Sequence, residues 1–523
     1  MIYPKLKRIR VLTALFFFIL LSALFLDIHG IFNTQYSDYV LSLQFIPSII
    51  NFVSIPSILA AGFIVILILT VFYGRVYCSF LCPLGILMDS ILFIKRKFAK
   101  KKRDIFDYQK PQNIWRYSVL AITVISLFAG SLIVILLLDP YSNFGRIITQ
   151  IFRPPLEFAN NILVYVLEIF DYYEIKPVDY SLWQPFAFSF SVMILAIVVF
   201  LTIISGRLFC NTLCPVGITL GLFSKFSLFK INVDELTCTG CGLCEKVCKA
   251  QCIDSSEKQI DFDRCVACYN CFDSCPTIGL VFRTAKKQIK SPIEIVDIPK
   301  RNFIIALGAF FLSNSLIVKA QEKINVYVKN KIPVYRVKPI SPPGSISIAN
   351  MIEKCTACQM CVSACPTKVL QPSFLDYGLT GMMVPKMDNV SGFCNYDCTI
   401  CGEVCPTDAI LPTKIEEKKL IQIGKVILIK DNCVVYTQKT DCGACAEHCP
   451  TKSVRMEIDD DVKLRAPFIT QELCIGCGAC EYICPTIPYK SIYVESNQIH
   501  LAAKPPEKIE AKPSFEVEDD FPF

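Results

Sequence analysis

CTGCGLCEKVC at residues 238–248 and CVACYNCFDSCP at residues 265–276 place their cysteines in one repeated spacing, C-x2-C-x2-C-x3-C. Three thiolates on one tight loop can hold three corners of a [4Fe-4S] cube, and the fourth cysteine reaches across to a neighbouring cube. The spacing therefore predicts two cubes. One is held by Cys238, Cys241, Cys244 and Cys275, and the other by Cys265, Cys268, Cys271 and Cys248.

A structural zinc site is the alternative for these cysteines. Zinc sites usually combine two C-x2-C pairs without a third cysteine close by, whereas both motifs here have one. The spacing therefore favours iron–sulfur clusters. Such doubled motifs are typical of bacterial ferredoxins, which predicts an α+β ferredoxin domain over residues 231–290. Cys252 stands outside both sets and is expected to be a core thiol of that domain.

Composition indicates a membrane protein of several domains. The chain has 523 residues, of which 53% are hydrophobic and only 19% charged. The net charge is +7, but Lys and Arg gather beside apolar runs, which is typical of cytoplasmic membrane flanks, so no nucleic-acid partner is expected. The chain has 29 cysteines, which fit metal ligation better than disulfides in so long a chain. With only His29, His448 and His500 available, no haem is expected.

Residues 1–230 are predicted to form a membrane domain of four helices. The apolar runs at about 11–26, 55–73, 115–138 and 186–205 are each near the ~20 residues that a bilayer core requires. The basic start MIYPKLKRIR and the block FIKRKFAKKKRD after the second run place both regions in the cytoplasm. Residues 143–176 are expected to lie on the outer membrane face.

An internal repeat follows the second and fourth apolar runs. GRVYCSFLCPLG at 74–85 and GRLFCNTLCPVG at 206–217 share Gly-Arg, two Cys and a closing Pro-x-Gly. The repeat predicts two helical hairpins with pseudo-twofold symmetry. Cysteines at C-x3-C lie one helical turn apart, so four thiols are expected to converge if the copies face each other: Cys78, Cys82, Cys210 and Cys214. They are candidates for a redox or metal site or for a docking edge; the alternative is buried structural cysteines.

Residues 346–500 contain four further cysteine groups, and each group ends in Cys-Pro. Two are regular, one has an extra residue in its first gap, and one has a long first gap. Four more cubes are predicted, six in all, although the third group could instead hold zinc or nothing. The groups are Cys355, Cys358, Cys361 and Cys365; Cys394, Cys398, Cys401 and Cys405; Cys433, Cys442, Cys445 and Cys449; and Cys474, Cys477, Cys480 and Cys484.

The two cysteine-rich halves are joined by residues 291–345. Lys300-Arg301-x-Phe303 precedes a moderately apolar run, a pattern resembling a twin-arginine export signal with its first Arg replaced. The alternative is an ordinary fifth transmembrane helix over 302–318. Both readings place the second half outside the cytoplasm, so the first ferredoxin is expected in the cytoplasm and the C-terminal one in the periplasm of a bacterial inner-membrane protein. Residues 501–523 are expected to be a flexible tail.

The repeat, the apolar runs and the following two-cluster motif resemble the NapH-type membrane ferredoxins of periplasmic nitrate reduction. Similar halves occur in NosR and in MauN-type proteins. The resemblance covers residues 1 to about 290. It implies a membrane component that oxidises quinol, draws on the quinone pool and passes electrons to a redox partner.

Residues 346–500 resemble the NapG-type and MauM-type four-cluster ferredoxins, so the chain looks like a fusion of two usually separate proteins. In related four-cluster subunits the first group exchanges its last cysteine with the fourth, and the second with the third. Exchange between neighbouring groups is the alternative, and the spacing does not choose between them. The first pattern pairs Cys484 with the 355–361 loop, Cys365 with 474–480, Cys405 with 433–445, and Cys449 with 394–401.

A row of cubes can move single electrons. The resulting hypothesis is quinol oxidation in the helical domain and electron delivery to a periplasmic reductase of the nitrate or nitrous oxide type. Asp27, His29 and Asp139 are the candidates for handling quinol and its protons. A redox-linked assembly or regulatory factor for a respiratory metalloenzyme is the alternative function. The first ferredoxin and the last four cubes are predicted on opposite membrane sides, and the CP-repeat cysteines could bridge part of that gap.

Overall fold

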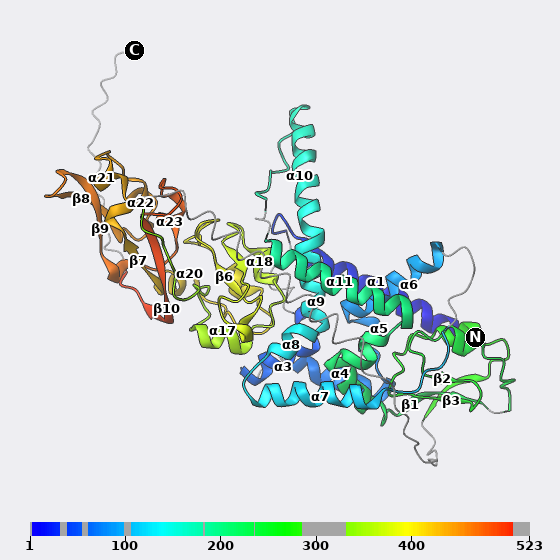
Figure 1. The fold of residues 1–523 in the computed structure, drawn as a ribbon. Helices are drawn as coiled ribbons and strands as arrows, with labels where there is room; N and C mark the ends of the chain where they lie inside the picture. The colour runs from blue at the N-terminus through cyan, green and yellow to red at the C-terminus, as the bar shows by residue number, and fades with distance from the viewer. Residues whose placement is uncertain are drawn as a thin grey trace.

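A helical part and two cysteine-rich parts make up the protein (Figure 1). The computed structural model describes residues 3–31, 39–54, 61–98, 106–180, 184–234, 236–284 and 331–505. The predicted fifth helix and export signal, the basic block beyond residue 98 and most of the C-terminal tail lie outside the described residues.

Helix α1 (Tyr3–Leu26) links the two cysteine-rich parts. Near its start, Lys7 Nζ lies 2.5 Å from Asp273 of the first ferredoxin. At its end, the carbonyl of Phe25 accepts a hydrogen bond of 3.2 Å from Arg153, and α1 contacts α18 (Met360–Ala364) of the C-terminal half. Figure 1 shows α1 running from the first ferredoxin towards the second. Because a residue rises about 1.5 Å along a helix, the contacts at Lys7 and Phe25 lie about 27 Å apart.

Two helices of the described residues, Lys5–Leu26 within α1 and α11 (Pro185–Ser205), are long and apolar enough to cross a membrane by length and composition. The other two predicted spans differ. The second is described only as α4 (Gly62–Tyr73). The third is divided into α7 (Asn113–Phe128) and α8 (Ile133–Leu138), because the chain turns at Gly130, where φ is +71°. The predicted four-helix membrane bundle is therefore found only in part.

The segment predicted to lie on the outer membrane face is instead a run of consecutive helices. Asp139 caps the first of them, since its carboxylate accepts from the backbone N–H of Ser142 at 2.8 Å, and Pro140 takes the first helical position. The first turns are buried in the helical part, whereas the last stretch projects from it (Figure 1). The run comprises α9 (Pro140–Ile147), the π-helical η2 (Ile148–Phe152) and α10 (Arg153–Glu168).

Each CP repeat begins where a glycine ends a helix. Gly74 closes α4 at φ +80°, and Gly206 closes α11 at φ +59°, a backbone region that favours glycine. A Cβ at Gly206 would also lie 2.3 Å from the carbonyl oxygen of Lys249. The glycines therefore let the repeats fold tightly against the first ferredoxin. The remaining helices here are α3 (Phe45–Ser54), α5 (Tyr77–Phe80), α6 (Pro83–Phe98), the π-helical η3 (Phe209–Leu213) and α12 (Pro215–Ser224).

The first ferredoxin is closed by its terminal strands. These pair antiparallel, with Phe229 opposite Thr284 and Val233 opposite Leu280, and the two cysteine loops lie between them in sequence. A short hairpin and two one-turn helices complete the domain. Its elements are β1 (Phe229–Val233), α13 (Leu243–Lys246), β2 (Ile253–Asp254), β3 (Gln259–Ile260), α14 (Asn270–Ser274) and β4 (Leu280–Thr284).

The C-terminal half contains three two-stranded antiparallel sheets: β5–β6, β7–β10 and β8–β9. Short helices carry the cysteines between them. In order the elements are α17 (Ile348–Lys354), α18, β5 (Leu370–Pro372), η5 (Leu379–Gly381), β6 (Pro385–Met387), α19 (Ile400–Glu403), α20 (Ile415–Lys418), β7 (Ile421–Leu428), η6 (Lys430–Asn432), α21 (Val434–Thr437), α22 (Ala444–Glu447), β8 (Val454–Asp459), β9 (Leu464–Ile469), η7 (Gln471–Leu473), α23 (Ala479–Ile483) and β10 (Ile492–Ala502).

The C-terminal half contacts the helical part at α9, and also through the ion pair of Lys368 with Glu157 at 3.0 Å and the packed rings of Phe186 and Phe374. The buried guanidinium of Arg146 donates from Nε to the carbonyl of Ala357 at 3.0 Å and from Nη2 to that of Thr356 at 3.2 Å. A Cβ at Gly145 would lie 2.4 Å from the carbonyl oxygen of Cys358, so the cysteine loop lies directly on the helix. The first cysteine loop of the C-terminal half is therefore the one that meets the helical part.

Candidate iron–sulfur sites

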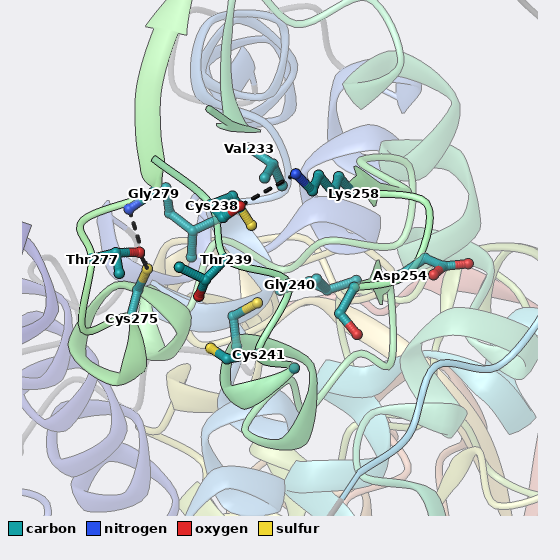
Figure 2. Close-up of a pocket in the computed structure, with 15 residues that line it drawn as sticks. Val233, Cys238, Thr239, Gly240, Cys241, Asp254, Lys258, Cys275, Thr277 and Gly279 are labelled. Carbon is teal, nitrogen blue, oxygen red and sulfur yellow. Dashed lines mark hydrogen bonds between the residues drawn. The ribbon is translucent and has the colours of Figure 1, made fainter. Parts of the chain in front are cut away.

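The outer set of the first ferredoxin lines one pocket. Cys238, Cys241, Cys244 and Cys275 all border it, and Figure 2 shows three of them from two separate loops around the same space. The backbone N–H of Gly279 donates to Cys275 Sγ at 3.2 Å. Hydrogen bonds to ligand sulfur are one means by which a protein sets a cluster's reduction potential.

The inner set of the first ferredoxin surrounds Cys271. Burial raises the pKa of the Cys271 thiol, and the neighbouring thiolates of Cys268, Cys265 and Cys248 raise it further. The structure therefore brings Cys248 to the loop of the second motif. Cys252 is 1% exposed and its sulfur lies 3.6 Å from that of Cys248, in the domain core.

The four regular loops share one backbone feature. The second and fourth residues after the first cysteine have positive φ in every case. Two loops use glycine there and two use other residues, which need a well-determined surrounding to hold that conformation. The pairs are Gly240 and Gly242, Ala267 and Tyr269, Ala357 and Gln359, and Gly476 and Gly478.

In the C-terminal half, the first two groups exchange their last cysteines. Cys365 lines one pocket with Cys394, Cys398 and Cys401. Conversely, burial raises the pKa of Cys361, and among its neighbouring thiolates Cys405 joins Cys355 in raising it further. The structure thus groups Cys355, Cys358 and Cys361 with Cys405, and Cys394, Cys398 and Cys401 with Cys365, as two candidate ligand sets.

The last two groups are arranged in the same way. Burial raises the pKa of Cys480, as do the thiolates of Cys477, Cys474 and Cys449. Burial raises the pKa of Cys445 to about 12, with contributions from Cys442, Cys433 and Cys484. Cys433, despite its long gap, therefore lies beside the other members of its group. The structure groups Cys433, Cys442 and Cys445 with Cys484, and Cys474, Cys477 and Cys480 with Cys449, as the third and fourth candidate ligand sets.

This arrangement corrects the pairing that the resemblance implies. Cys484 does not join the 355–361 loop, because Cys405 occupies that place, and Cys449 does not join 394–401, because Cys365 does. The physical reason is that each group is followed directly by its partner along the chain, so short connections close both exchanges. The second and fourth cubes are adjacent, since the N–H of Cys394 donates to the carbonyl of Cys477 at 2.8 Å.

The pairing can be tested by replacing one exchanged cysteine. In Cys405→Ser, the first cube loses a ligand, so anaerobic alkylation followed by mass spectrometry should label Cys355, Cys358 and Cys361. Cys442 and Cys445 should stay protected, because their cube is completed by Cys484. Cys449→Ser is the matched control and should expose the 474–480 loop. Labelling of Cys442 and Cys445 in Cys405→Ser would instead support the first-to-fourth pattern.

The two CP repeats face each other and their arginines cross between the copies. Arg75 Nη2 lies 3.8 Å from Cys78 Sγ of its own copy and donates to the carbonyl of Cys210 at 3.0 Å. Arg207 Nη1 lies 3.8 Å from Cys210 Sγ and donates to the carbonyl of Cys78 at 3.2 Å. The contacts are reciprocal, which is the geometry of a pseudo-twofold axis.

All four CP-repeat thiols are buried, and they are brought together. The thiols of Cys78 and Cys210 are electrostatic neighbours of Cys82, and those of Cys210, Cys82 and Cys78 are neighbours of Cys214. Among the described residues, no three His, Cys, Asp or Glu side chains are close enough to share one metal ion. A [4Fe-4S] cube does not require several side chains around one ion, because each thiolate binds a separate iron.

The three quinol candidates lie in two places. Asp27 and His29 follow the end of α1: Asp27 accepts from the backbone N–H of Ile31 at 3.0 Å, and His29 Nε2 lies 3.1 Å from Asn160 Oδ1. Asp139 is buried, 1% exposed, at the start of α9. The structure does not bring Asp139 together with the other two.

Sequence reasoning missed the buried charges around the repeats. Asp89, on α6, forms ion pairs with Arg207 at 2.8 Å, Lys249 at 3.0 Å and Arg10. These residues come from α6, α1, the second repeat and the first ferredoxin. A signal existed for Arg75 and Arg207, because a charged residue repeated beside apolar runs is costly to bury. The sequence around Asp89 and around Arg146 contains no pattern that predicts their burial.

Comparison with known families supports iron–sulfur binding along the chain. Residues 55–101 and 186–234 match a family described as a 4Fe-4S binding domain. Other families of 4Fe-4S binding domains match 235–251 with 262–278, and 351–371. A 4Fe-4S dicluster domain matches 440–487. The chain is a multi-cluster iron–sulfur protein of the ferredoxin type.

Relatives match parts of the chain. An uncharacterised protein of Methanocaldococcus jannaschii is 27% identical over 230 residues, 43% of this chain and 72% of that protein. The ferredoxin-type protein NapG of Escherichia coli is 29% identical over 156 residues, 28% of this chain and 65% of NapG. The methylamine utilization ferredoxin-type protein MauM of Methylobacillus flagellatus is 24% identical over 156 residues, 28% of this chain and 63% of MauM. No solved structure matches. The chain is thus an electron-transfer protein related to the Nap and Mau ferredoxins.

Proposed function

We propose that this protein oxidises quinol at a cytoplasmic membrane and delivers the electrons through six [4Fe-4S] clusters to a reductase outside the cytoplasm. The observation that carries the proposal is the position of the two ferredoxin parts at opposite ends of α1. The contacts at Lys7 and Phe25 lie about 27 Å apart along the helix, and a bilayer core is about 30 Å thick. One ferredoxin on each side of a membrane fits that separation.

The cysteine sets form a row consistent with this path. The inner set of the first ferredoxin adjoins the CP repeats, since Ser79 donates to the carbonyl of Val266 at 2.6 Å. The cube of Cys355, Cys358, Cys361 and Cys405 adjoins the helical part through Arg146, and the second, fourth and third cubes follow outward. Quinol oxidation releases two electrons and two protons, and each cube accepts one electron at a time.

Asp139 is the favoured acceptor for a quinol proton. It is buried between the two redox parts: Tyr77 of the first repeat and Cys358 of the first C-terminal cube are both its electrostatic neighbours. Within the described part of the chain, the nearby polar atoms Gln44 Nε2 and Tyr141 Oη have no hydrogen-bond partner. An ionisable residue buried within membrane helices is by default a functional candidate.

Asp139→Asn should lower quinol-dependent cluster reduction about a hundredfold, because general acid–base groups typically contribute 10²–10⁴-fold. Chemical reduction of the clusters by dithionite should be unchanged. Asp179→Asn, an exposed aspartate, is the control and should keep the wild-type rate. The measurement is stopped-flow absorbance of the full chain mixed with a quinol analogue. If Asp139→Asn, Asp27→Asn and His29→Gln all keep the wild-type rate, the quinol proposal fails.

A further inference from the structure

The four CP-repeat cysteines form a set that the six cubes do not use. Cys78, Cys82, Cys210 and Cys214 are each 3–4% exposed. Each repeat segment matches a 4Fe-4S binding family, yet contains only two cysteines, and an all-cysteine cluster takes four. A complete ligand set exists only because the fold brings the two copies together.

Two buried arginines lie against these thiols. Arg75 and Arg207 are both 0% exposed. Among the described residues, no carboxylate lies within ion-pair distance of Arg75, and its Nε has no hydrogen-bond partner. Its polar contacts are Asn211, two carbonyls and the sulfur of Cys78. A buried guanidinium without an anion is strongly unfavourable, so this site calls for negative charge at the sulfurs.

We propose that Cys78, Cys82, Cys210 and Cys214 together hold one additional iron–sulfur cluster, shared by the two repeats, with Arg75 and Arg207 as its buried counter-charges. Thiolate ligation gives such a cluster the negative charge that Arg75 lacks, while Arg207 also pairs with Asp89 at 2.8 Å. The closing glycines make room for this arrangement. A Cβ at Gly217 would lie 2.1 Å from the carbonyl oxygen of Cys210 and 2.8 Å from Arg75, and one at Gly85 would lie 2.3 Å from that of Cys78 and 2.7 Å from Arg207.

The helix starts after each CP pair favour the same chemistry. Cys214 caps α12: its sulfur accepts from the backbone N–H of Gly217 at 3.3 Å, and Pro215 takes the first helical position. Cys82 receives an equivalent backbone hydrogen bond from Gly85. N–H groups and the positive end of a helix dipole stabilise a thiolate. One thiol of each pair is therefore prepared to act as an anionic ligand.

The site lies between the two ferredoxin parts. Asn211 donates to the carbonyl of Ala250 at 3.3 Å, close to Cys248 of the inner cube. On the other side, Tyr77 of the first repeat is an electrostatic neighbour of Asp139, which neighbours Cys358. A cluster here would accept one electron from a reduced neighbour and pass it on, with no bond made or broken. The inference concerns cofactor content, so it stands or falls independently of quinol as the donor.

The test compares the anaerobically purified full chain with the double variant Cys82→Ser/Cys214→Ser. Six cubes account for about 24 irons per chain, since each holds four. The wild type should contain two or four irons more, and the variant should lose them together with one component of the EPR spectrum of the reduced protein. A loss of two irons identifies a [2Fe-2S] cluster, and a loss of four a [4Fe-4S] cluster.

A control cysteine variant and two variants of Arg75 distinguish loss of the cluster from a general loss of structure. Cys252→Ala, the remaining cysteine outside all ligand sets, should retain the full iron content. Arg75→Gln should retain the iron but lower the midpoint potential of the same EPR component, and Arg75→Lys should restore it in part. If the double variant does not accumulate, the wild-type iron count alone decides. About 24 irons in the wild type, or a disulfide between Cys78 and Cys82 in its peptide map, would overturn the proposal.

Discussion

Arg146→Gln is expected to weaken the docking of the C-terminal half on the helical part without unfolding either. Arg146 donates two charge-assisted hydrogen bonds to the carbonyls of Thr356 and Ala357. Such bonds contribute about 1.5–3 kcal/mol each. Glutamine is shorter and uncharged, so both carbonyls would lose their donor. A loss of about 3 kcal/mol corresponds to about a hundredfold lower preference for the docked state.

Hydrogen exchange of the full chain measures this effect. In Arg146→Gln, amides of the 355–361 loop and of α9 should exchange faster, while amides of β7 and β10 should be unaffected. Electron transfer from the first ferredoxin into the C-terminal clusters should slow at the same time. Lys386→Gln is the matched control, because Lys386 pairs with Asp376 at 2.7 Å on the exposed surface, and such pairs contribute about 0–1 kcal/mol. Unchanged exchange at α9 would show that Arg146 does not hold the interface.

Asp89→Asn is expected to destabilise the helical part by about 3–5 kcal/mol, the usual cost of removing one partner from a buried ion pair. The Asp89 carboxylate faces Arg10, Arg207 and Lys249, whose side chains are 6%, 0% and 8% exposed. Without it, three buried cations from three different segments lie close together with no anion among them. The first ferredoxin and the start of α1 should separate from the second repeat.

Thermal unfolding in detergent, followed by loss of iron–sulfur absorbance, measures this destabilisation. Asp273→Asn is the control. Asp273 also joins α1 to the first ferredoxin, through Lys7, but both side chains are about one-third exposed. Its loss should change the free energy of unfolding by less than about 1 kcal/mol. Equal effects of the two substitutions would contradict the assignment of Asp89 as the central anion.

The cysteine loops could be predicted from sequence because their geometry is local. The spacing of Cys355, Cys358 and Cys361 already implies three ligands on one loop. The identity of the fourth ligand is a tertiary property, and here the resemblance implied Cys484 where the structure places Cys405. Spacing within a group carries no information on which group lies beside it.

The helical part shows the same limit. The continuous apolar run of α11 predicted a single helix correctly. The third run also predicted one helix, but Gly130 divides it into two. The start of α9 had a local signal that went unused, since Asp139-Pro140 is a cap followed by proline at the first position. The contact of Arg146 with the C-terminal half had no local signal, because its acceptors there lie 210 and 211 residues away in the chain.

The two pseudo-twofold copies differ at an equivalent position that lies against the first ferredoxin. Asp89 and Gly221 occupy the same place, the seventh residue after the second cysteine (82 to 89, and 214 to 221). On one side the carboxylate receives Lys249 of the first ferredoxin. On the other, any Cβ would meet the carbonyl oxygen of Asp263 at 2.7 Å. If the two repeats and the helices after them were identical, the first ferredoxin could bind them in two orientations related by a half-turn. The difference between Asp89 and Gly221 allows only one of these orientations.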